Sequence, residues 1–77
     1  MDTIILDDNI EYYIVKELPI DNVIYTLFAN VNDNTDICFR KTSCDSEGNL
    51  FYTGLDDERE FDKVSNYFAK EMLKEID

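Results

Sequence analysis

The sequence contains no histidine and no tryptophan, and it has only one proline and two glycines. Without histidine, the chain lacks the side chain that most often acts as general base or metal ligand at neutral pH. A Ser-His or Cys-His nucleophilic pair is therefore excluded. Two glycines are also too few for a glycine-rich loop that cradles phosphate. We therefore expect a protein that is not an enzyme, with no catalytic residues and no cofactor.

Basic residues are scarce, because 7 Lys and Arg stand against 18 Asp and Glu, which gives a net charge of −11. Nucleic acids and anionic membranes are bound through Lys and Arg, so we expect neither as a direct partner. No apolar run approaches the roughly 20 residues needed to cross a bilayer. The N-terminus lacks the basic start of a signal peptide. These features predict a cytoplasmic location.

The chain has two cysteines, Cys38 and Cys44. On one continuous strand they would lie roughly 20 Å apart, which is too far for a disulfide. Their spacing also differs from the Cys-x-x-Cys pattern of redox pairs. We predict two reduced thiols, one inside a sheet and one near a turn, as is usual in the cytoplasm.

Acidic segments at 32–36 and 45–48 invite comparison with a calcium-binding loop. An EF-hand loop needs oxygen ligands at fixed positions and a glycine at the sixth. Counting from Asp33 places Ile37 at a ligand position, and counting from Asp45 brings Gly48 too early. We interpret both segments as hairpin turns and expect no metal site.

The C-terminal part of the chain carries apolar residues at helical spacing. They are Phe61, Val64, Phe68, Met72 and Ile76. This stripe predicts a helix over 57–76 that must cover another surface. Asp57 and Glu60 fit a capping box at its start.

Upstream of this helix, short β-rich runs alternate with turn residues. The predicted strands are 3–6, 10–18, 23–31, 37–43 and 50–53. We expect one small α+β domain over 1–77, with a four- or five-stranded antiparallel β-meander and the C-terminal α-helix packed on one face. Phe61 and Phe68 should insert into the core of that face. Their expected neighbours are Ile14, Leu27, Ile37 and Phe39.

The second predicted strand has one face more apolar than the other. Ile10, Tyr12, Ile14 and Leu18 share a parity and are expected to face the core, with Lys16 as the exception. Pro19 cannot donate a ladder hydrogen bond, so the strand is expected to end before it.

Several stretches of this sequence together carry a family resemblance. They are the acidic turn 7–9, the strands at 12–18, 23–28 and 37–40, the loop 45–50 and the helix start 56–61. Their order resembles the domain of unknown function 1292, the YrzB-like family of small acidic bacterial proteins. The chain departs from that family in its two cysteines and in an Asn-rich turn where a Glu-rich one is common. The resemblance implies the α+β fold and a cytoplasmic, bacterial setting, and it supplies no catalytic residues.

The sheet face away from the helix is the candidate interaction surface. Tyr13, Val15, Ile24 and Phe28 are expected to share it, and a contiguous apolar patch often marks a partner or a homodimer. The alternative is that strand twist or other side chains cover this face.

We interpret the protein as a small acidic, non-catalytic protein-binding module. A phage-type DNA-mimic inhibitor that blocks a nucleic-acid-binding site is the alternative function, suggested by the charge of −11.

Overall fold

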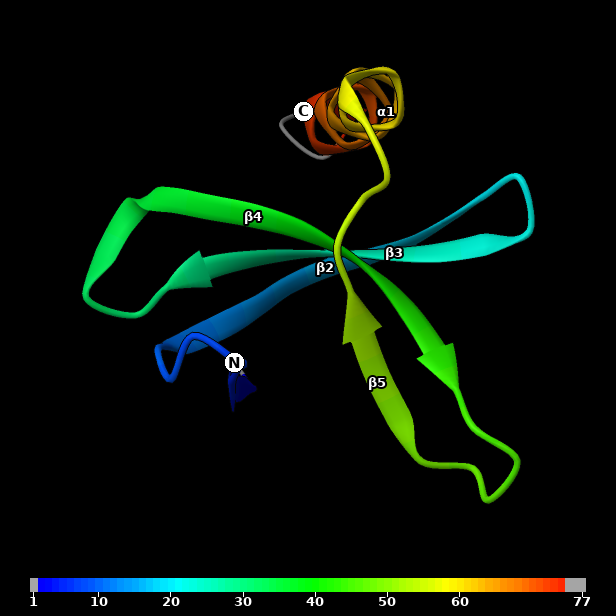
Figure 1. Ribbon diagram of the computed structural model, residues 1–77. Coiled ribbons are helices and arrows are strands. Elements are labelled where there is room, and N and C mark those ends of the chain that lie inside the picture. The colour runs from blue at the N-terminus through cyan, green and yellow to red at the C-terminus, as the bar shows by residue number, and fades with distance from the viewer. Residues whose placement is uncertain (1, 75–77) are drawn as a thin grey trace.

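The structure is a computed structural model and describes residues 2–74. These residues form five strands and one helix (Figure 1). Their bounds are β1 Thr3–Ile5, β2 Glu11–Ile20, β3 Val23–Asn30, β4 Asp33–Cys44, β5 Leu50–Thr53 and α1 Glu58–Lys74. The strands form one antiparallel sheet in the order β1-β2-β3-β4-β5. The predicted α+β meander is therefore confirmed, while Ile76 of the predicted helical stripe lies outside the described residues.

Residues that tolerate positive φ make the turns between strands. Asp21 and Asn22 join β2 to β3 with φ of 52° and 69°. Two successive positive φ values are typical of a type I′ turn, whose twist matches that of the flanking strands. Asn9 and Gly48, in the turns before β2 and before β5, have φ of 66° and 87°. Asn and Gly adopt this backbone with little strain, so the local sequence determines these hairpins.

A β-bulge divides β2 into two halves that face opposite ways. The register against β3 shifts between Ile14 and Lys16, which leaves Val15 as an extra residue. A shift by one residue moves every later side chain to the other face of a sheet. Leu18 therefore packs against the helix-side core, whereas Tyr12 and Ile14 face away from the helix. The prediction that these three residues share one face is wrong.

Two strand ends also differ from the prediction. Pro19 lies inside β2 rather than after it. Because β1 pairs only with residues 11–13, the edge of β2 beside Pro19 needs no hydrogen-bond donor. β4 begins at Asp33, so Asn32 is the one residue of the predicted turn 32–36 that lies in the turn, and residues 34–36 fall at a register shift between β3 and β4. Only residues 31–32 connect β3 to β4, and Asn30 pairs with Asp33 directly across that turn.

The helix α1 lies across one face of the sheet and buries a core there (Figure 1). The buried members are Ile20, Tyr25, Leu27, Phe39, Val64 and Phe68. The ring centroid of Phe39 lies 5.1 Å from that of Phe68 and 5.6 Å from that of Phe61. The predicted insertion of Phe68 against Phe39 is confirmed. Two predicted neighbours are not in this core, since Ile14 faces away and Ile37 is 52% exposed.

On the opposite face of the sheet, curling of the sheet brings side chains of β2, β3 and β5 into contact. Phe28 is fully buried there, and its ring makes edge contacts with Tyr12 and Tyr52 at centroid distances of 6.3 and 5.2 Å. Tyr52 belongs to β5, which β4 separates from β3, so these rings meet only because the sheet curls. Figure 1 shows β5 bending away from the helix. Thr26 is buried beside them, with its hydroxyl 2.6 Å from that of Thr42.

Both cysteines lie on β4 and neither is in a disulfide. Cys38 is half-buried in the sheet, and burial raises the pKa of its thiol. Cys44 is exposed at the last residue of the strand. The prediction of two separate thiols, one in the sheet and one near a turn, is confirmed.

Candidate functional site

The four residues predicted to form one interaction surface are divided between the two faces of the sheet. Phe28 is fully buried on the face away from the helix, where Ile24 is 46% exposed. Val15 packs against the helix-side core. Tyr13 pairs with Ala29 on the helix side and is 38% exposed. The expected common face is wrong, because alternation within a strand can be read from sequence whereas the register between strands cannot.

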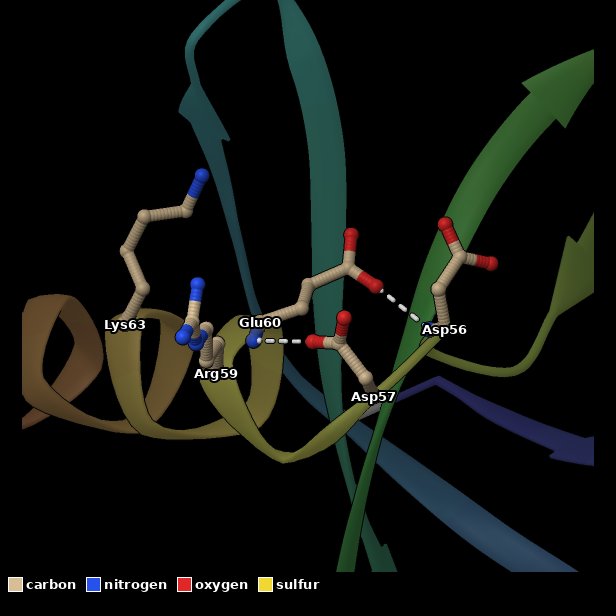
Figure 2. Close-up of a pocket in the computed structure, with 5 residues that line it drawn as sticks. All are labelled: Asp56, Asp57, Arg59, Glu60 and Lys63. Atoms are coloured by element: carbon tan, nitrogen blue, oxygen red, sulfur yellow. Dashed lines mark hydrogen bonds between the residues drawn. The ribbon is translucent and has the colours of Figure 1, made fainter.

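A polar hollow of about 300 Å³ lies at the start of α1. Its walls are Asp56, Asp57, Arg59, Glu60 and Lys63. Figure 2 shows the side chains of Asp57 and Glu60 folded back over the first helical turn. The Asp57 carboxylate accepts a hydrogen bond from the Glu60 amide at 2.9 Å, and the Glu60 carboxylate accepts one from the Asp56 amide at 2.5 Å. The predicted capping box is present, with its return bond one residue earlier than expected.

Glu60 also fastens the helix start to the sheet. The Tyr25 hydroxyl donates to its carboxylate at 2.6 Å, and the Lys41 ammonium lies 3.2 Å away. Lys41 donates to Asp56 as well, at 2.8 Å. Burial opposes ionisation of Glu60, but the hydrogen bonds from Tyr25, the Asp56 amide and Lys41 outweigh it and lower the pKa of Glu60. Burial and the bond to Glu60 raise the pKa of Tyr25 to about 12. These contacts give the polar hollow a structural role.

Replacing Glu60 tests this role through its pH dependence. Glu60→Gln should lower the melting temperature at about pH 7, because the charge attraction to Lys41 is lost. The folded-state pKa of Glu60 is lowered, so its contribution is present above the unfolded-state pKa and is lost as pH falls through the folded-state value. The difference in melting temperature between wild type and variant should therefore be constant above the ordinary glutamate pKa of about 4.3 and should shrink as the pH is lowered over the acid range below it. A difference that stays constant over this range contradicts the assignment.

An apolar groove of about 440 Å³ lies between α1 and the sheet. The sheet side of the groove is formed by Val15, Leu27, Ala29, Asn34, Ile37 and Phe39. The helix side is formed by Phe61, Ser65, Phe68, Ala69 and Met72. Of the predicted interaction residues, Val15 lines this groove and Tyr13 pairs with a residue that does, while Ile24 and Phe28 lie on the other face.

The groove exists because the helix fills only part of the sheet face. Val64 and Phe68 are buried against the sheet. Lys63, on the flank of α1 away from the groove, makes a 3.0 Å ion pair with Asp21 of the β2–β3 turn. The neighbouring flank of the helix carries Ser65 and Ala69 at a spacing of four residues, so both lie on one side. Their short side chains leave unfilled space above the sheet.

In the acidic turn at 45–49, the aspartate carboxylate accepts hydrogen bonds from backbone amides of the same turn. The Asp45 carboxylate accepts from the amides of Glu47 and Asn49, each at 2.9 Å. The hydrogen bond from the Asn49 amide lowers the pKa of Asp45 most, and the bond from the Glu47 amide lowers it further.

Within residues 2–74, no group of three His, Cys, Asp or Glu side chains is arranged to hold a metal ion. In the same part of the chain, no helix has both the length and the apolar character to span a membrane.

Comparison with known families finds a matching family model. The model of a family described as protein of unknown function (DUF1292) matches residues 7–73. The chain belongs to this family. The resemblance found in the sequence is thereby confirmed over nearly the whole chain. Comparison with curated proteins and with solved structures finds no match.

The apolar groove lies wholly within the part of the chain that matches DUF1292. Three of its large apolar side chains are about half exposed: Ile37 at 52%, Phe61 at 48% and Met72 at 39%. They are held by β4 and α1, which are regular elements, so the exposed surface is already formed. The sequence predicted that Phe61 inserts into the core and that Met72 belongs to the helical stripe that covers the sheet. The signal that was missed is the pair of small residues beside the helical stripe.

Proposed function

We propose that this DUF1292 protein is a non-catalytic protein-binding module of the cytoplasm, and that a segment of its partner binds in the apolar groove. The groove is the observation that supports this function. Large exposed apolar surfaces on small domains mark interaction sites. Small-molecule sites usually add several converging polar groups, whereas Asn34 and Ser65 are the polar residues in this lining. The two unpaired cysteines support the cytoplasmic setting.

A DNA-mimic inhibitor is the alternative that the charge of −11 suggests. Such a mimic presents carboxylates in rows that replace phosphates. In this chain Asp8, Asp45 and Asp57 each accept hydrogen bonds within their own turn or helix cap. Their placement is accounted for by local structure, which favours the binding module over the mimic.

A matched pair of variants tests the groove. Ile37 and Ile24 are the same residue type with exposed fractions of 52% and 46%, and they lie on opposite faces of the sheet. The tagged wild-type protein would be used to capture partners from a lysate of its source cells. Ile37→Gln should reduce the captured partner roughly tenfold, because anchor side chains at an interface each contribute about 1.4 kcal/mol or more. Ile24→Gln should retain the partner at the wild-type level.

Salt dependence separates the two functions in the same experiment. Apolar burial is not screened, so a part of the capture that depends on Ile37 should remain at about 0.5 M NaCl. Capture that is lost at this salt, survives Ile37→Gln and is displaced by duplex DNA would contradict the binding module and support the mimic. Circular dichroism of both variants verifies that each is folded.

A further inference from the structure

Acidic side chains stand on the groove side of α1. Glu58 and Asp62 are exposed, and their helical spacing places them on the same flank as Ser65, which lines the groove. Lys63 and Lys74 lie on the other flank. Each of these lysines is already in an ion pair, at 3.0 and 3.1 Å. The helix thus places exposed acids on the groove side, whereas the lysines of the other flank are each neutralised by an acidic partner.

The sheet side of the groove adds a further acid beside its lining. Asp33 is exposed at the first residue of β4, directly before the lining residue Asn34, and its carboxylate accepts hydrogen bonds from the amide and the hydroxyl of Thr35. Lys16 lies on β2 opposite Leu27, which forms part of the groove floor, and Lys16 is itself already engaged in another interaction. The rim of the groove is therefore predominantly acidic, as is the whole chain at −11.

We propose that the occupant of the groove is a basic amphipathic segment of a protein, with apolar anchors flanked by Lys or Arg. This inference rests on the proposed function and uses the same site. The anchors bury against Ile37, Phe61 and Met72, while the flanking cations lie beside Glu58 and Asp62. Charge complementarity of this kind steers association and rejects acidic partners. A second copy of the chain would bring two bodies of charge −11 together, so self-association at this face is opposed.

Two model peptides probe this preference directly. Both have about 18 residues and leucines at the i, i+3, i+4 and i+7 positions of a helix. One carries lysine at the other positions and the second carries glutamine. Fluorescence anisotropy of labelled peptides gives the dissociation constants. The Leu/Lys peptide should bind the wild-type protein at least about tenfold more tightly than the Leu/Gln peptide, and Ile37→Gln should weaken it about tenfold whereas Ile24→Gln should not.

A pair of double variants separates rim recognition from overall charge. Glu58→Lys with Asp62→Lys reverses two charges on the groove side of α1. Asp7→Lys with Glu47→Lys makes the same change in net charge in two exposed turns that do not line the groove. The first double variant should weaken the Leu/Lys peptide roughly five- to tenfold more than the second.

Three other results of the peptide titrations would each contradict the inference, and each points to a different explanation. Equal weakening by both double variants would mean attraction to the whole acidic surface. Equal affinity for both peptides, still lost in Ile37→Gln, would remove the basic preference and leave the proposed function standing. Peptide binding that Ile37→Gln does not change would place the basic segment elsewhere. The proposed function itself fails only if partner capture from the lysate is also unchanged by Ile37→Gln.

Discussion

Phe28→Ala is expected to leave a large fraction of the protein unfolded at room temperature. The Phe28 side chain has no exposed surface, and its ring contacts Tyr12 and Tyr52 at 6.3 and 5.2 Å. Removing a buried phenylalanine costs roughly 3–5 kcal/mol. The free energy of unfolding of so small a domain is itself roughly 3–5 kcal/mol. We therefore expect the cluster of Phe28, Tyr12 and Tyr52, on the face away from the helix, to be essential for the fold.

The matched control is Phe51→Ala, which removes the same side chain from a position that is 45% exposed. Urea unfolding followed by circular dichroism compares the two. Phe51→Ala should lower the free energy of unfolding by about 1 kcal/mol or less, since little packing is lost. Phe28→Leu keeps most of the volume and should remain folded at a smaller cost. A cooperative, nearly unaffected Phe28→Ala would show that the curl of the sheet does not enclose this ring.

Phe68→Ala should have the second large effect, again roughly 3–5 kcal/mol of unfolding free energy. Phe68 is 1% exposed, and its ring centroid lies 5.1 Å from that of Phe39. The ring packs in the core between α1 and the sheet, so its loss should loosen the helix from the sheet. Tyr67→Ala is the matched control, because Tyr67 is the adjacent aromatic residue and is 47% exposed. Equal melting temperatures of the two variants would mean that α1 faces elsewhere.

Local patterns in the sequence predicted most of the elements. The 3.6-residue stripe and the Asp57–Glu60 cap gave a helix over 57–76, and the structure has Glu58–Lys74. The positive-φ turn residues Asp21 and Asn22 marked the hairpin between β2 and β3. These signals act over a few residues, which is why they can be read from sequence alone.

The register between strands could not be predicted in this way. The bulge at Val15 reverses the faces of β2 after that point. In the sequence, the signal of this bulge was Lys16, the one charged residue among the apolar residues of its parity. The burial of Phe28 depends on Tyr52, which reaches it only through the curl of the sheet. Both effects depend on residues distant in sequence. The predicted interaction surface failed for this reason, since it needed the faces of β2 and β3 to be matched.

The groove was missed because it arises from side chains that are too small to fill a space. Ser65 and Ala69 on α1 and Ala29 on β3 lie around it. Sequence periodicity indicates which side of a helix is apolar, but it does not show how far across a sheet that side reaches. Only the packed structure shows that Ile37 and Met72 remain partly exposed.

Site-specific photo-crosslinking tests the binding role of the groove most directly. A photoreactive amino acid would replace Ile37 in one variant and Ile24 in another, two residues of similar exposure on opposite faces. After irradiation in the source cells, we expect a discrete crosslinked protein from position 37 and none from position 24. Crosslinking to the same partner from position 24 alone, or no crosslinked protein from position 37, would contradict the account.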